Sequence, residues 1–312
     1  MDTLETYETH ETDFVLLCKS YRGDARRVKR LMDSLARHNP QQLPVVLVVP
    51  EADQALFREL LSGHRFKLVS DEDVVRSHPL AESRDLLARY RATPGYRSQQ
   101  VIKADAWRLL RCAAWLCMDS DTVFLRDISR ADFLTPAGHP YTLLHQSREF
   151  LQMALNRGQT KVLREFRDES ERLKAVFGRV GPDHDFGPTP LLWSARVWDD
   201  LQTKYLQPKG WTLWDAIDFA PSEIRWYDEA LLAYRSIPIA PIEPLFRVYH
   251  HDWQLFALQR LGETPATLAQ QFLGVVYQSN WEYELDAAGH RSAASTLVRR
   301  LKRWRQRLGA WR

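Results

Sequence analysis

The sequence predicts an α/β fold in which a mixed, mostly parallel sheet is flanked by helices. Short apolar runs rich in β-branched residues alternate with segments whose apolar residues recur every three or four positions. One apolar run ends directly in two acids, as strands do where an open α/β sheet binds a ligand. With 312 residues, 45% of them hydrophobic, the chain is long enough to build one large core.

The first part of the chain alternates regularly. We expect strands at residues 13–18, Val45–Val49 and 66–69, because each is a short apolar run, and Pro50 stops the second. A helix is expected at residues 24–38, where Asp24 could serve as the N-cap and the apolar residues have helical spacing. A shorter helix is expected at residues 52–61. Strands connected by helices favour a parallel sheet.

Further along, a helix at residues 96–110 precedes a fourth strand at residues 115–118, and residues 122–125 continue in extended form. Helices are also expected at residues 148–177, 222–235 and 264–272. The chain contains no internal repeat and no linker. We therefore expect an acidic, frayed N-terminus (1–12), one domain (13–290) with halves at 13–125 and 126–290, and a separate basic tail (291–312).

Charge and cysteine usage suggest the compartment. Eight of the 43 Lys and Arg residues lie in 291–312, which contains no acid, so the rest of the chain is net acidic. The acidic start has no apolar core, so we expect no signal peptide, and no run of about 20 apolar residues could span a membrane. The three cysteines lack metal-type spacing and indicate a cytoplasmic protein.

The most specific motif is LCMDSDTVFL, which places Asp119 and Asp121 at the carboxyl end of the fourth strand. Two buried carboxylates this close repel each other unless a cation lies between them. Mg²⁺ or Mn²⁺ is held in this way at phosphate sites, by one or two carboxylates together with phosphate oxygens and water. The alternative is a solvated Asp-Ser-Asp turn.

Two chemistries use such a pair. In sugar transfer from a nucleotide sugar, a metal ion stabilises the departing diphosphate. In phosphoryl transfer, Asp119 would attack phosphorus and Asp121 would act as acid and base. A full β-α-β-α-β unit precedes the motif, whereas the phosphatase-like fold opens with its aspartate strand. The position of the motif therefore favours sugar transfer.

These segments resemble the GT-A-fold (Rossmann-like) glycosyltransferases, and more closely a bacterial family of uncharacterised glycosyltransferases linked to surface polysaccharide synthesis. The resemblance rests on DFVLLCKSY, GYRSQQVIKADAWRLL and MDSDTVFLRDI, followed by PTPLLWS, WYDEALLAY and VYQSNWE. It covers roughly residues 13–285, and the acidic motif is its most specific part. It implies a GT-A-like sheet and a nucleotide-sugar donor.

The resemblance also implies donor contacts in the first half. Lys19, Ser20 and Tyr21 follow the first strand and would meet base and ribose, with Tyr21 available for stacking. Gln99 and Lys103 share one helix face, so Lys103 could offset the diphosphate charge. A surface-packed ring for Tyr21 and a solvated Lys103 are the alternatives.

In the second half, the resemblance implies donor-sugar contacts at Asp185 and a catalytic or sugar-binding carboxylate at Asp228 or, preferably, Glu229. Those two acids are equally well explained as helix-start charges. His250, preferred over the adjacent His251, would be the third metal ligand beside Asp119 and Asp121. Two loop histidines without a metal are the alternative.

The tail has the pattern of a basic amphipathic helix. Leu297, Leu301, Trp304, Leu308 and Trp311 form one stripe, and Lys and Arg fill the other faces. Such helices lie on anionic membranes, although packing against the body is the alternative. No nucleic-acid-binding motif is present, so no nucleic acid partner is expected.

Together these observations predict a Mn²⁺- or Mg²⁺-dependent glycosyltransferase at the inner face of the plasma membrane. It would use a nucleotide sugar and a glycan or lipid-linked acceptor. The alternatives are an aspartyl-nucleophile phosphatase and a non-catalytic, membrane-bound module that binds a nucleotide or glycan.

Overall fold

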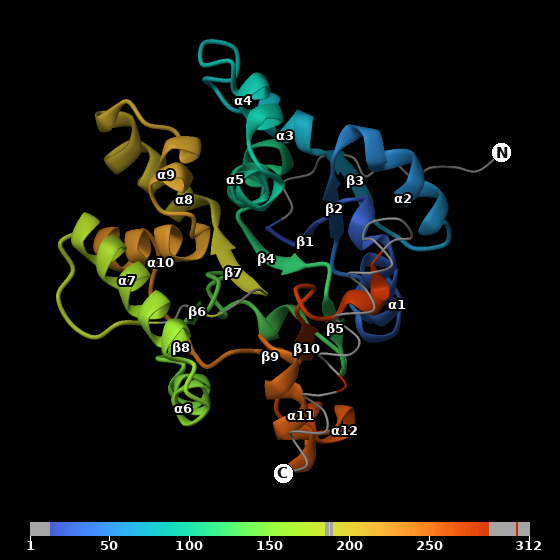
Figure 1. Cartoon of the computed structure of the whole chain (residues 1–312). Helices are drawn as coiled ribbons and strands as arrows, with labels where there is room; N and C mark the ends of the chain where they lie inside the picture. Colours follow the sequence, from blue (N-terminus) through green and yellow to red (C-terminus); the bar gives the residue numbers. More distant parts are fainter. Residues whose placement is uncertain (1–12, 185–186, 188–189, 287–303, 305–312) are drawn as a thin grey trace.

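The computed structural model describes residues 13–184, 187, 190–286 and 304, and its centre is a five-stranded sheet (Figure 1). The strand order is β3-β2-β1-β4-β7, formed by Lys67–Ser70, Val45–Val49, Phe14–Lys19, Ala114–Asp119 and Leu191–Ser194. The first four strands run parallel, and β7 pairs antiparallel with β4. The predicted mixed, mostly parallel sheet is therefore confirmed.

Helices cover both faces of this sheet, which explains why its strands are apolar throughout rather than alternating. Val15 and Leu17 of β1 face a core built with α3, α4, α5, α8, α9 and α10. Leu16 and Cys18 face the opposite core, built with α1 and α2. These helices are Asp71–Arg76, Leu86–Ala92, Gly95–Leu110, Ala195–Leu201, Leu213–Phe219 and Glu223–Tyr234 on the first face, and Ala25–His38 and Gln54–Leu60 on the second.

Two smaller sheets extend the fold. In the first, β5 (Thr122–Phe124), β10 (Gly274–Tyr277) and β9 (Phe246–Tyr249) lie in that order, with β10 antiparallel to β5 and parallel to β9. In the second, β6 (Thr142–Leu143) pairs parallel with β8 (Pro241–Ile242). The chain thus leaves the central sheet at the acidic motif and enters the three-stranded sheet.

The remaining helices are α6 (Arg148–Asn156), α7 (Thr160–Val176), α11 (Asp252–Arg260) and α12 (Pro265–Leu268). Figure 1 shows α7 to α10 gathered beside β7, and α11 and α12 beyond β9 and β10. The helical stretch predicted at 148–177 is interrupted where Gly158 adopts a left-handed conformation (φ 67°). The helix predicted at 264–272 is confined to the four residues of α12.

The helical segment predicted for the tail and the frayed start lie outside the described residues, except Trp304, whose side chain is exposed. Within the described ranges, no helix is both long and apolar enough to cross a bilayer. The two predicted halves share the central sheet, because β7 comes from the second half and completes the four strands of the first.

Candidate active site

The acidic pair lies at the carboxyl end of β4, as the sequence predicts. Asp119 is the last residue of β4, and Asp121 lies in the turn before β5. The Asp121 side chain is held in place by the backbone N–H of Ser279, which donates to Oδ2 at 2.8 Å. The other carboxylate oxygen, Oδ1, is buried and has no hydrogen-bond partner within the described part of the chain.

The electrostatic environment of Asp121 favours a cation. Burial and the neighbouring Asp119 raise the pKa of Asp121 to about 7, and Asp24 and Glu282 add to this effect. An orphaned, buried carboxylate oxygen among other acids is costly unless a positive charge neutralises it. Oxygen ligands of this kind suit Mg²⁺ or Mn²⁺. The residues present therefore fit a divalent cation, with Asp121 as its first ligand.

Asp119 already has an internal partner. Lys103 on α5 is buried and places Nζ 2.6 Å from Asp119 Oδ1 and 3.5 Å from Glu223 Oε1. Burial alone would lower the pKa of Lys103, but Asp119 and Glu223 outweigh it and hold that pKa above its usual value. In this structure Lys103 thus offsets the charge of Asp119. Sequence reasoning missed Glu223, whose only signal was its position at the start of a helix. The other predicted α5 residue, Gln99, lies half-buried one turn before Lys103.

The side chains of the three residues predicted to bind the base and ribose differ in their exposure to solvent. Lys19 is buried, with Nζ 2.9 Å from Asp71 Oδ2, and Asp71 also accepts a hydrogen bond from Tyr90. Ser20 is buried as well. Tyr21 is 39% exposed, and its ring lies so close to Gly23 that a Cβ there would meet it at 2.5 Å. Of the three, Tyr21 presents a ring that could stack on a base.

The predicted catalytic carboxylates lie inside α10 rather than at its start. The helix begins at Glu223, so the expectation that Asp228 and Glu229 open it is wrong. Both side chains are buried, and Glu229 accepts hydrogen bonds from two nitrogens of Arg179 at 2.5 and 2.6 Å. This bidentate pair fixes the position of the Glu229 carboxyl group. Asp185, the predicted donor-sugar contact, lies outside the described residues.

His250 follows β9, and its ring packs against Phe150 with the ring centroids 4.6 Å apart. The described ranges contain no group of three His, Cys, Asp or Glu side chains close enough to hold a metal ion. The three-ligand set of Asp119, Asp121 and His250 therefore remains a prediction.

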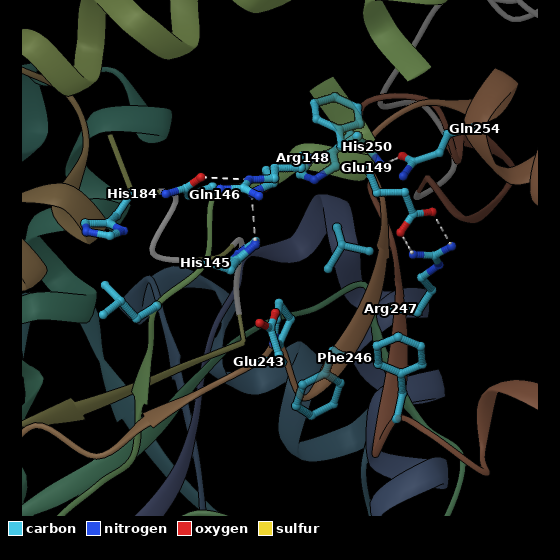
Figure 2. A pocket seen from close by; sticks show the side chains of 16 residues that line it. His145, Gln146, Arg148, Glu149, His184, Glu243, Phe246, Arg247, His250 and Gln254 are labelled. Carbon is cyan, nitrogen blue, oxygen red and sulfur yellow. Dashed lines mark hydrogen bonds and ion pairs between the residues drawn. The ribbon is translucent and has the colours of Figure 1, made fainter. Parts of the chain in front are cut away.

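His250 instead lines a cleft of about 630 Å³. The cleft lies between β9, the start of α6 and the segments that follow β6 and β8 (Figure 2). β6 and β8 are parallel, so their carboxyl ends deliver side chains to the same edge. His145 lies in the segment that follows β6, and Glu243 is the residue directly after β8. Sequence reasoning missed this cleft because its walls come from segments far apart in the chain.

Comparison with known proteins places this geometry in context. No curated protein matches the chain. The apo structure of the bifunctional glycosyltransferase WbbM superposes with a TM-score of 0.50 and 14% identity, covering 87% of this chain and 47% of that one. The chain thus spans about half the length of WbbM. For the apo form of mouse xyloside xylosyltransferase 1 the TM-score is 0.49 and the identity 9%, covering 86% and 99% of the two chains. The likeness to WbbM shows that the predicted layout is a glycosyltransferase fold. The family of unknown function DUF6492 matches residues 12–282, and the chain belongs to this family.

Proposed function

We propose that this protein is a metal-dependent glycosyltransferase that moves a sugar from a nucleotide-sugar donor to a glycan or lipid-linked acceptor. The observation that carries the proposal is Asp121, a buried carboxylate with an unpaired oxygen at the carboxyl end of β4. In a glycosyltransferase fold, this is the edge of the sheet at which an open α/β protein binds its ligand.

The reaction would join an acceptor hydroxyl oxygen to the anomeric carbon and break the bond between that carbon and the diphosphate oxygen. The bonding electron pair leaves with the nucleoside diphosphate, and the hydroxyl proton passes to a carboxylate. A metal ion at Asp121 would supply positive charge for the diphosphate. Asp119 and His250 are the candidate further ligands, and Asp228 and Glu229 are the candidate carboxylates.

The chain's own residues suggest a division of roles. Tyr21 would stack on the base of the nucleotide, because its ring is exposed and it lies two residues after Lys19, whose backbone pairs with that of Asp119. Lys103 would hold Asp119 in place. Glu229, fixed by Arg179, is better suited to position a sugar hydroxyl than to move a proton, because both of its oxygens already accept hydrogen bonds from Arg179.

The proposal extends to the cellular context. The basic stripe of residues 291–312 would hold the protein on an anionic membrane at the cytoplasmic face, where lipid-linked acceptors are available. Surface polysaccharide synthesis in bacteria is the setting that we propose for this activity.

Thermal unfolding of the full-length protein with UDP or GDP, with and without MnCl₂, tests the proposal. We expect one nucleotide to raise the unfolding midpoint only when Mn²⁺ is present, because a ligand that binds the folded state alone stabilises it. Asp121→Asn should abolish this shift. Asp127→Asn is the matched control, because Asp127 lies on the surface and pairs with His38.

Three results would contradict the proposal. Nucleotide without effect on the wild type would favour the non-catalytic module. A shift that survives in Asp121→Asn would remove the metal site. Covalent trapping of a phosphate mimic on Asp119 would favour the phosphatase alternative.

A further inference from the structure

The cleft beside β9 has a mixed lining. Its apolar surface comes from Leu144, Pro244, Phe246, Val248 and Phe272, and polar side chains surround it (Figure 2). Small-molecule sites typically combine such an apolar surface with a few polar groups that fix orientation, in cavities of about 300–1,000 Å³. The cleft, at about 630 Å³, lies within this range.

Some polar groups of the cleft already satisfy one another. Arg247 contacts Glu149 at 3.0 Å, and it also pairs with Glu263. Arg247 and Glu149 line the cleft, whereas Glu263 pairs with Arg247 from outside the lining, so neither lining side chain offers a free charge to a ligand. They are not the groups that select what binds.

Two charged side chains of opposite sign have no ion-pair partner in the part of the chain that we describe. Arg148 is exposed and donates from Nε only to the neutral Gln146 side chain at 2.8 Å. Glu243 is exposed at the other wall, and no ion pair joins it to a described residue. Among the described lining residues, two arginines (Arg148, Arg247) and two glutamates (Glu149, Glu243) sum to zero charge, which favours a neutral ligand over an anion or a cation.

The histidines add neutral hydrogen-bonding groups. His145 accepts the backbone N–H of Ser147 at Nδ1 (3.2 Å), so in its neutral form the proton lies on Nε2. That Nε2–H is buried and has no hydrogen-bond partner among the described residues. Burial and the nearby Arg179 lower the pKa of His184, which favours the neutral form of this second ring. The unpartnered Nε2–H of His145 beside an apolar surface suits a hydroxyl oxygen.

The cleft lies close to the acidic pair. Tyr277 of β10 donates its backbone N–H to the Asp121 carbonyl oxygen at 3.2 Å. On its other side, Tyr277 pairs with Tyr249 of the neighbouring strand β9, and Tyr249 directly precedes His250. Two strand spacings, about 10 Å in total, therefore separate the backbone at Asp121 from the His250 end of the cleft. A sugar attached to a diphosphate at Asp121 would reach this end.

We propose that the cleft binds a neutral saccharide, as the acceptor subsite of the glycosyltransferase proposed above. The apolar face of a sugar ring would lie on the Phe246 side, and its hydroxyls would meet His145, Arg148 and Glu243. The role of the bound saccharide as acceptor rests on the proposed function. Saccharide binding itself does not, because it is predicted from the residues that line the cleft. Ser147, which lines the cleft, supports a functional role, since it is a non-glycine residue held in the left-handed region (φ 49°).

Saturation-transfer NMR on the full-length protein tests the proposal. The probes are methyl glycosides of glucose, galactose, mannose, xylose and rhamnose, with methyl β-glucuronide as the charged comparison. We expect transfer to at least one neutral glycoside and none to the glucuronide. The double variant Arg148→Ala/Glu243→Ala should weaken binding at least about tenfold, since it removes two charge-assisted hydrogen bonds. Both residues are exposed, so the fold should survive, and Arg126→Ala is the surface control.

The outcomes separate this inference from the proposed function. Absence of any transfer, preference for the glucuronide, or full binding by the double variant would each overturn the saccharide subsite. The Mn²⁺-dependent nucleotide shift is measured on the same samples and should be unchanged in the double variant. Saccharide binding without any nucleotide effect would keep the cleft assignment and reject the transferase.

Discussion

Replacing Asp121 by asparagine should stabilise the metal-free protein at alkaline pH while removing its metal site. The pKa of Asp121 is raised from 3.8 to about 7 by burial and by Asp119. The folded state thus holds the proton more tightly than the unfolded state. Ionisation therefore costs stability progressively from about pH 4 to pH 7, and the full cost applies above pH 7.

The size of this cost follows from the shift. At 1.36 kcal/mol for each pH unit, a carboxyl displaced from 3.8 to about 7 loses about 4 kcal/mol of unfolding free energy when fully ionised. Asparagine removes the charge but places an unpaired amide where Oδ1 lay, which costs about 1–3 kcal/mol. The net gain at pH 8 is then about 1–3 kcal/mol.

The pH dependence is the sharper test, because the amide cost is the same at every pH. Between pH 5 and pH 8, the stability of the variant relative to the wild type should rise by about 2.7 kcal/mol. Urea unfolding in EDTA at both pH values measures this difference, and Asp168→Asn, at an exposed carboxylate of α7, should show none of it. A variant whose relative stability is the same at pH 5 and pH 8 would refute the reasoning that Asp121 is buried, crowded by acids and in need of a cation.

Three other substitutions or deletions give separate readouts. Glu229→Gln should reduce turnover about 10²–10⁴-fold if Glu229 acts on the sugar or proton, with nucleotide affinity unchanged, and steady-state kinetics beside nucleotide titration check this. Lys103→Met should lower the unfolding free energy by about 3–5 kcal/mol, because it leaves the buried Glu223 and the half-buried Asp119 without their cation, and adding Glu223→Gln should restore part of the loss in urea unfolding. Deleting residues 291–312 should abolish salt-sensitive sedimentation with anionic vesicles and leave the nucleotide shift intact; a truncated protein that unfolds, with a full-length protein that ignores such vesicles, would assign the tail a packing role.

Secondary structure was predictable from the sequence wherever the pattern of apolar residues matches the burial of that segment in the folded protein. The strands of the parallel sheet are continuous apolar runs because both faces are buried, and that signal is visible in the chain itself. β7 was harder to assign, since its four residues follow a proline-rich loop and pair antiparallel with β4. The break at Gly158 and the shortness of α12 depend on packing that no helical periodicity reports.

The acidic motif was predictable for the same reason, whereas the partners of the charged residues were not. The sequence predicts Lys19 and Lys103 as cations available to a nucleotide. In the structure both side chains are buried and form ion pairs with carboxylates that lie far away in the sequence. A lysine is compatible with either role, and only the fold brings Asp71 or Glu223 within reach of it. Glu229 follows the same pattern, because its partner Arg179 is 50 residues away.

The buried cations that we describe near the candidate site are all paired with carboxylates, which limits what can neutralise a bound diphosphate. Lys103 is bound to Asp119 and Glu223, Lys19 is bound to Asp71, and the buried Arg27 is bound to Asp24 and Asp286. Using any of these cations for a diphosphate would leave a buried carboxylate without its partner, at a cost of about 3–5 kcal/mol. A divalent metal ion at Asp121 incurs no such cost, since it relieves repulsion that is already present. The internal pairing of the lysines and Arg27 is therefore a second argument for the metal dependence that we propose.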